Sequence, residues 1–256
     1  MAKKESTKPN SPQANRPLRG SLKASFKLYW KQLRTILITT LLPLLIIFAL
    51  RLLSDDYTGD QYSTLIGLVS VFNTLLLARL VTVGRDAKAV KLLPYYNGVM
   101  SRYLSGVGLI MMIAVYSAPL LVSLLLMGLI AVDQLAVGWL ALIIPFFIIG
   151  IGTSLLASLS IFAFMDDLSV NVIQTLRISG RVVRRYFRPL IGRAIGAVVC
   201  VIVFGVAMVY FGTLIAPVLQ SARVQLIADA VLSWIFTPFV FCYGAVIYRR
   251  LIEAYE

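Results

Sequence analysis

The chain has 256 residues, of which 59% are hydrophobic and only 14% are charged. Its mean hydropathy of +0.88 is far above that of a water-soluble protein, because a globule of this length cannot hide so many apolar side chains. Histidine is absent, which excludes His-based general catalysis, Ser-His-Asp chemistry and most zinc and haem sites. We therefore expect an integral membrane protein with no metal and no cofactor.

Apolar residues occur in runs of roughly 20 or more, the length that an α-helix needs to cross the hydrocarbon layer. Only helices and closed barrels satisfy the backbone in lipid, and these runs lack the alternation of barrel strands. The predicted fold is an all-α polytopic transmembrane helical bundle with about six spans. The expected spans are Ile36–Leu53, Ser63–Val83, Ser105–Val132, Ala136–Met165, Leu190–Leu219 and Val224–Tyr248.

Residues 1–20 combine Lys, Ser, Pro, Asn and Gln with almost nothing to bury, so we expect a disordered cytoplasmic arm. Residues 21–256 are expected to form a single six-helix membrane domain. Prolines inside four of the spans predict tolerated kinks, and two isolated cysteines inside spans predict no disulfide. These residues are Pro43, Pro119, Pro145 and Pro238, with Cys200 and Cys242.

The 24 Lys and Arg residues give a net charge of +13, and most of them lie in alternate connections between the spans. The remaining connections carry the acids Asp55, Asp56, Asp60, Asp133 and Asp229. The positive-inside rule then predicts a multi-pass protein with both termini in the cytoplasm. Nucleic-acid binding is not expected, because the charges flank spans at every cytoplasmic turn instead of forming one patch.

A basic amphipathic helix is predicted to begin at Ser21, just before the first span. Apolar residues recur at helical spacing on one face and basic residues recur on the next face. Such a helix should lie on or enter the inner leaflet, with Trp30 and Tyr29 at headgroup level. The apolar residues are Leu22, Phe26, Tyr29 and Leu33, and the basic residues are Lys23, Lys27, Lys31 and Arg34.

A second basic helix is predicted before the fifth span, with Asp167 or Ser169 as its N-cap. Its arginines fall at i, i+4, i+7 and i+11, which places them in a stripe about 60° wide beside an apolar face that can sink into the leaflet. We expect both basic helices to contact anionic inner-leaflet headgroups. The arginines are Arg177, Arg181, Arg184 and Arg188, and the apolar residues are Val172, Leu176, Val183 and Phe187.

The two basic stretches can be aligned without a gap, SLKASFKLYWKQLRTIL from Ser21 with TLRISGRVVRRYFRPLI from Thr175. Each stretch is followed by a predicted inside-to-outside span, which indicates a repeated unit at the two ends of the protein. Convergence is the alternative, because any basic interfacial helix favours this spacing.

Three further positions have two interpretations each. Arg79 lies inside the second span, where its side chain either snorkels to the cytoplasmic interface or has a buried function. Asp166 and Asp167 either cap a helix and pair with Arg177 or Arg181, or form a metal or catalytic site. Asn73 and other scattered polar groups in the spans either make helix-packing contacts or line a pathway.

The order of these features resembles a broad bacterial group, the YciC-like inner-membrane proteins and the membrane domain attached to some glycerophosphodiester phosphodiesterases. The resemblance runs from about Gly20 to Tyr248 and is carried mainly by DDLSVNVIQTLRISGRVVRRYFRPLIG at residues 166–192. It implies a multi-pass membrane module of unassigned activity in a bacterial-type inner membrane, and it carries over no catalytic residue.

The predicted cytoplasmic segments, residues 1–34, 84–104 and 166–189, are each shorter than the roughly 40 residues that a domain needs to fold alone. We therefore expect no enzyme, but a membrane module that assists a membrane-protein partner or handles lipid-like molecules. The alternative is a small permease for a neutral or amphiphilic solute, with Asn73 and the kinked helices lining its path. An enzyme acting on lipid is a third hypothesis.

Overall fold

The computed structural model describes Leu18, residues 20–54, 60–83, 92–131, 137–193 and 222–255, and in these residues it is helical without strands. The predicted all-α fold is therefore confirmed. Its named elements, in chain order, are α1 (Ser21–Leu52), η1 (Asp60–Tyr62), α2 (Ser63–Val83), α3 (Leu92–Met100), α4 (Tyr103–Ala131), η3 (Val137–Trp139), α5 (Leu140–Ser158), α6 (Ser160–Asp166), α7 (Val172–Arg185) and α9 (Ala222–Tyr255).

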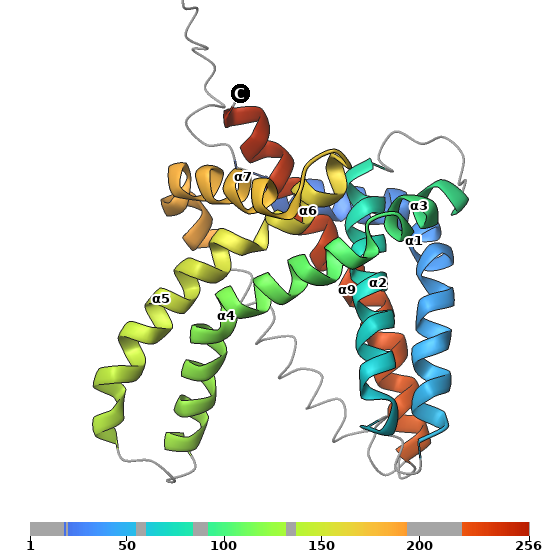
Figure 1. Ribbon diagram of the computed structural model, residues 1–256, viewed down its shortest axis with the longest axis horizontal. Coiled ribbons are helices and arrows are strands. Elements are labelled where there is room, and N and C mark those ends of the chain that lie inside the picture. The colour runs from blue at the N-terminus through green and yellow to red at the C-terminus, as the bar shows by residue number, and fades with distance from the viewer. Residues whose placement is uncertain are drawn as a thin grey trace, which may run out of the picture.

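Five helical segments are long and apolar enough to cross a membrane, so the chain is a multi-pass membrane protein. They confirm the predicted first, second, third, fourth and last spans. The predicted fifth span, Leu190–Leu219, lies mainly outside the described residues. The helical residues before it and the start of α9 lie at opposite ends of the molecule (Figure 1), as a further span between them requires.

The first span and its basic lead-in form one continuous helix of 32 residues, α1. Helix α1 begins after Gly20, whose φ of 72° lies in the left-handed region that suits glycine. Its first part lies across the same end of the molecule as α7, and its remainder runs toward the opposite end (Figure 1). Hydroxyls of Thr39 and Thr40 donate to the carbonyls of Thr35 and Ile36, a bonding pattern that bends helices.

The long helices form two groups that diverge away from α7 (Figure 1). Helices α1, α2 and α9 pack together in one group, and α4 and α5 form a hairpin in the other. Helix α7 lies across the end where the groups meet, and the C-terminal end of α9 also lies there. The prolines Pro43, Pro119, Pro145 and Pro238 all stand inside helices that continue past them, as predicted.

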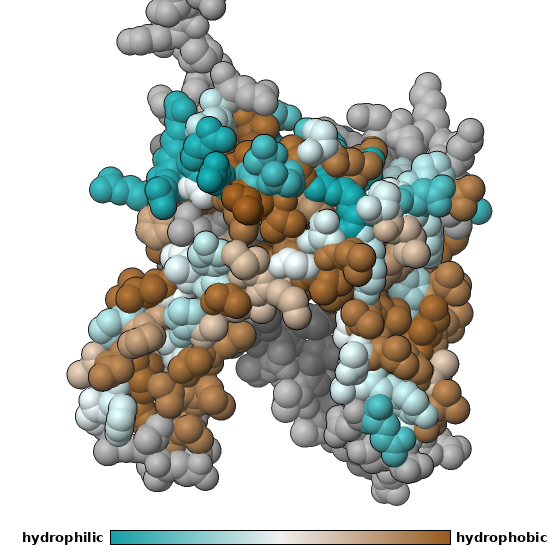
Figure 2. Space-filling view, in the orientation of Figure 1, coloured by the Kyte–Doolittle hydropathy of each residue, from teal (hydrophilic) through white to brown (hydrophobic). Residues whose placement is uncertain are grey.

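Burial differs sharply along the length of the molecule. The buried core is centred on α6 and the adjoining half of α2, with Phe164, Met165 and Leu75 fully covered. The far halves of α4 and α5 instead expose large apolar side chains such as Leu125 and Ile148. Hydrophobic side chains cover both groups, whereas hydrophilic ones gather over α7 (Figure 2). This distribution suits helices whose outer surfaces face lipid.

Candidate functional site

The basic lead-in of α1 has three faces rather than two. One face is buried against protein and consists of Ser21, Ser25, Tyr29, Gln32 and Ile36. The next face around the helix is apolar and exposed, since Leu22, Phe26 and Trp30 keep 57%, 54% and 59% of their surface accessible. The third face carries the predicted cations Lys23, Lys27, Lys31 and Arg34, all of which are exposed.

This arrangement corrects the prediction for Tyr29, which was placed on the apolar face with Leu22. The Tyr29 hydroxyl donates to the carbonyl of Ile235 in α9 at 2.9 Å, and its ring packs edge-on against Phe239. Leu33 is partly buried, so Trp30 takes its place on the exposed apolar face. The signal in the sequence was the pair of small residues Ser21 and Ser25 at i and i+4, a spacing that favours close helix packing.

Helix α7 begins at a capping box that was not predicted from the sequence. The Asn171 side chain accepts from the Gln174 backbone N–H at 2.8 Å, and the Gln174 side chain accepts from the Asn171 N–H at 3.3 Å. This capping box satisfies two N–H groups of the first turn. The expected caps Asp167 and Ser169 lie before the helix instead, with Asp167 in an extended conformation.

The apolar side of α7 packs on the protein and does not sink into the leaflet as expected. Its buried residues are Thr175, Ser179, Val182 and Val183, and the helix contacts α5 and α6. Among the predicted apolar residues, Val172 and Leu176 also pack against the core, while Phe187 is exposed. The predicted arginines therefore project from the side of α7 that faces away from the helices beneath it.

The arginine stripe is shorter on α7 than predicted, because the helix ends at Arg185. Tyr186 leaves the helical conformation with φ −113° and ψ 27° and donates from its hydroxyl to the carbonyl of Ala254 in α9. Arg188 belongs to the helical residues after this break. All four predicted residues, Arg177, Arg181, Arg184 and Arg188, are exposed.

The two aligned basic stretches match in burial as well as in sequence. Ser21 and its counterpart Thr175 are both buried, as are Ser25 with Ser179, Tyr29 with Val183, and Ile36 with Leu190. The aligned cations are exposed in both. The shared register means that each basic helix turns the same positions toward the protein.

Arg79 is half-buried and closes the carbonyl end of α6 together with Arg102. Arg79 donates to the carbonyls of Met165 and Asp166, at 2.5 and 3.3 Å. Arg102 donates to the carbonyls of Phe164 and Asp167, at 2.8 and 2.9 Å, and also to that of Val170, and its guanidinium stacks 3.7 Å from the centre of the Phe164 ring. Two cations at a helix C-terminus satisfy its free carbonyls and oppose the negative end of its dipole.

Asp166 and Asp167, at the C-terminal end of α6, have different partners from those predicted. Asp167 accepts from the backbone N–H and the hydroxyl of Ser169, at 2.8 and 2.7 Å, and these bonds hold its pKa below the ordinary value, with a smaller contribution from Arg102. Asp166 accepts from the Tyr248 hydroxyl at 3.5 Å. Burial lowers the pKa of Arg102, and Asp167 partly opposes that shift. Asp167 therefore shapes the turn between α6 and α7, and Asp166 connects the end of α6 with α9.

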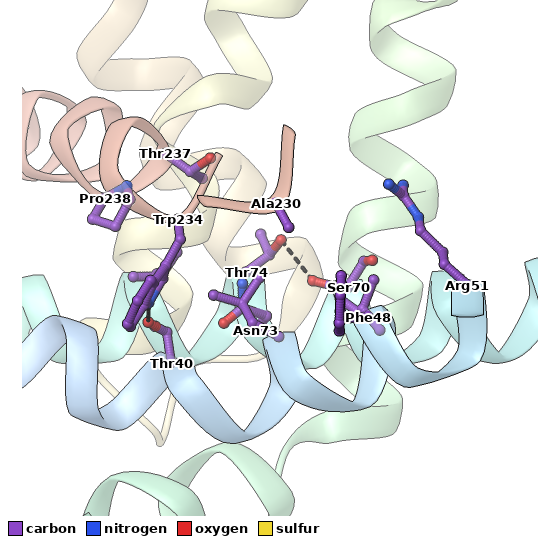
Figure 3. Close-up of a pocket in the computed structure, with 13 residues that line it drawn as sticks. Thr40, Phe48, Arg51, Ser70, Asn73, Thr74, Ala230, Trp234, Thr237 and Pro238 are labelled. Atoms are coloured by element: carbon purple, nitrogen blue, oxygen red, sulfur yellow. Dashed lines mark hydrogen bonds between the residues drawn. The ribbon is translucent and has the colours of Figure 1, made fainter. Parts of the chain in front are cut away.

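Asn73 lines a cavity of about 260 Å³ between α1, α2 and α9 (Figure 3). Thr40 and Trp234 lie at one end of the cavity, and Arg51 lies at the other end. The sequence predicted Asn73 either as a helix-packing residue or as part of a pathway lined by the kinked helices, but no spacing in the sequence indicated Arg51 or Trp234 as its neighbours. Cys242 is buried as a free thiol in α9, and Cys200 lies outside the described residues.

In the described parts of the chain no group of three metal-binding side chains comes together. Comparison of the chain with protein-family models, with characterised proteins and with solved structures gives no significant match. The exposed basic faces of α1 and α7 and the cavity beside Asn73 are therefore the features that indicate a function.

Proposed function

We propose that this chain is a non-enzymatic membrane module that binds anionic headgroups of the inner leaflet through the basic faces of α1 and α7. In this role it assists a membrane-protein partner or handles lipid-like molecules in a bacterial-type inner membrane. The resemblance of residues 166–192 to YciC-like proteins stays a prediction, and it agrees with such a module.

The three faces of the α1 lead-in carry this proposal. A helix whose apolar side chains lie directly beside a row of cations can place the first in the acyl boundary and the second among headgroups. Trp30 adds an indole, which favours headgroup depth. Because Ser21, Ser25 and Tyr29 are buried against protein, the helix can lie in the interface without leaving the bundle.

The expected strength follows from the number of cations. Each Lys or Arg near an anionic surface contributes about 1 kcal/mol, so the four cations of α1 or the four around α7 can contribute several kcal/mol before screening. Beside these four arginines the exposed large apolar side chains are Ile173 and Phe187, which do not form a continuous stripe. We therefore expect α1 to anchor the module and the arginines to add electrostatic attraction.

Native mass spectrometry of the full protein, extracted from bilayers of equal phosphatidylglycerol and phosphatidylethanolamine, tests this proposal. Changing Lys23, Lys27, Lys31 and Arg34 to Gln should reduce retained phosphatidylglycerol by about ten-fold or more, because several kcal/mol of attraction is removed. Changing Lys23, Lys27 and Lys31 to Arg keeps the charge and should keep the retention.

The corresponding change of Arg177, Arg181, Arg184 and Arg188 to Gln should reduce retention by a smaller factor, with a weaker dependence on salt than in the unmodified protein. If both Gln variants retain the anionic lipid as the unmodified protein does, at low and moderate salt, the cations only set orientation during insertion and the lipid-binding proposal is wrong.

The alternative, a small permease for a neutral or amphiphilic solute, is favoured by one observation. Asn73 and the proline-containing helix α9 line the same cavity. A permease requires that a solute crosses the membrane through this cavity, whereas the module does not. Transport of a solute through the cavity, and not its occupancy, is therefore the property that separates the two functions.

A further inference from the structure

The cavity between α1, α2 and α9 is long and narrow. Its lining residues on α1 run from Thr40 to Arg51, which spans about 16 Å at 1.5 Å per residue. Its volume of about 260 Å³ lies just below the range of about 300 to 1,000 Å³ for sites that hold whole drug-sized ligands. The cavity can thus enclose part of an elongated molecule.

Two polar atoms of this lining are buried without a hydrogen-bond partner in the described structure, Oδ1 of Asn73 and Nε of Arg51. Their neighbours are satisfied. The Thr74 hydroxyl donates to the carbonyl of Ser70 at 2.8 Å, and the Thr40 hydroxyl accepts from Nε1 of Trp234 at 2.9 Å. A buried polar group without a partner costs about 1–3 kcal/mol, so each of these atoms is a ready contact for a ligand.

The chemistry of the lining indicates the class of ligand. Arg51 is the charged residue among the described lining residues, which favours an acidic group at that end. Asn73 offers a free acceptor between Arg51 and Thr40, as Figure 3 shows, which favours a hydroxyl or amide donor on the ligand. Leu44, Ile47 and Phe48 supply an apolar wall, which favours a hydrocarbon chain.

We propose that this cavity binds an anionic single-chain amphiphile, with its acidic group on Arg51, a hydroxyl or amide donor on Asn73 and its chain along the apolar wall of α1. The site is separate from the basic faces of α1 and α7, because it lies along the other part of α1. It goes beyond the proposed headgroup binding and does not depend on it.

Fluorescence of Trp234 provides a direct probe, because its indole lines the cavity. The chain has three tryptophans, so the double change Trp30→Phe and Trp139→Phe leaves Trp234 as the sole one. The full-length variant is reconstituted in nanodiscs of phosphatidylcholine and titrated with an N-acylglycine brominated near the end of its acyl chain. The neutral methyl ester of the same compound is the matched control ligand.

The acid should quench Trp234 with saturation, and the ester should quench at least about ten-fold more weakly, because it lacks the charged partner of Arg51. Arg51→Gln and Asn73→Leu should each weaken binding of the acid by about ten-fold, while Arg51→Lys should lose less. Quenching that rises linearly and equally for acid and ester reports partition into the bilayer and would overturn the proposal. Saturable binding unaffected by Arg51→Gln would overturn it as well.

Native mass spectrometry of the unmodified protein with the unbrominated N-acylglycine provides a second measurement that does not depend on the tryptophan variants. One retained acid per chain, displaced by neither the ester nor added phosphatidylglycerol, is expected. Displacement by phosphatidylglycerol would place the acid on the basic helices, and no retention would leave the cavity without a ligand of this class. Either result would contradict the proposal without affecting the test of headgroup binding.

Discussion

At the scale of single residues, the sequence predicted where Arg102 lies but not which groups it contacts. The sequence placed it in a basic connection, where positive charge reports orientation. In the structure its guanidinium bonds to carbonyls of the α6–α7 turn, 62 to 68 residues away in the chain. Arg79 contacts partners 86 and 87 residues away. No local pattern encodes such pairings, which is why neither arginine could be predicted as a helix cap.

Removing this cap should destabilise the fold. Arg102→Gln leaves carbonyls at the end of α6 and in the following turn without their charged donor, so we expect the free energy of unfolding to fall by about 2 kcal/mol. Arg102→Lys should recover only part of this loss, because an ammonium lacks the planar fork that bonds several carbonyls and stacks on Phe164. The measurement is thermal or denaturant unfolding of the purified protein in one detergent.

Arg181→Gln is the control for this change. Arg181 is exposed on α7, and substitutions at such surface positions usually change stability by less than about 0.5 kcal/mol. Equal losses for Arg102→Gln and Arg181→Gln would show that net charge, and not closure of α6, is responsible.

At the scale of elements, the sequence identified the spans well, but it did not assign every face of the two basic helices correctly. The repeat of Ser21 and Ser25 in Thr175 and Ser179 gave the correct register, and the structure buries all four residues. The apolar face of the second basic helix was wrongly assigned to lipid, because an apolar stripe beside cations looks alike whether it meets lipid or protein. Matched burial shows that the two basic helices turn the same aligned positions toward the protein.

The α4–α5 hairpin depends on one glycine more than on its neighbour. A Cβ added at Gly150 would lie 2.5 Å from Cα of Leu120, whereas nothing lies within 4 Å of one added at Gly152. Gly150→Ala should therefore force the helices apart and destabilise the protein by about 1–3 kcal/mol. Gly152→Ala should be neutral or stabilising by up to about 1 kcal/mol, because alanine favours helix.

Both variants gain the same helix propensity, so the difference between their unfolding free energies isolates the contact with Leu120. Cysteines placed on facing positions of α4 and α5 provide a second measurement. They should form a disulfide more slowly in the Gly150→Ala variant, because the two helices are then farther apart. If the two alanine variants unfold alike, the hairpin is looser at Gly150 than the structure indicates.

At the scale of the whole molecule, the sequence predicted the class of protein and five of its spans, because crossing lipid demands long apolar helices whatever their packing. It could not predict that the helices form two diverging groups with a core at one end, since that depends on contacts between helices. The cavity with Arg51, Asn73 and Trp234 escaped prediction for the same reason, as its lining comes from three helices far apart in the chain.

The orientation of the molecule is the remaining prediction. The lead-in of α1, α7 and the C-terminal end of α9 lie at one end (Figure 1), and the exposed cations of both basic helices lie there too. The positive-inside rule places such an end in the cytoplasm. Reporter fusions after Asp60, Asp133 and Ala222 should therefore read outside, and fusions after Lys91, Arg185 and Glu256 should read inside.

Arg185 is the decisive fusion point, because it ends the helix with the densest positive charge. An inside signal there places α7 in the cytoplasm. The first part of α1 and the C-terminal end of α9 lie at the same end of the molecule, so they are then cytoplasmic too. The Lys23, Lys27, Lys31 and Arg34 to Gln variant serves as a second arm, since the remaining cytoplasmic charges should keep the same topology while headgroup binding falls. An outside signal at Arg185 in the unmodified chain would invert the molecule, place α7 against the outer leaflet and remove the physical basis for binding inner-leaflet headgroups.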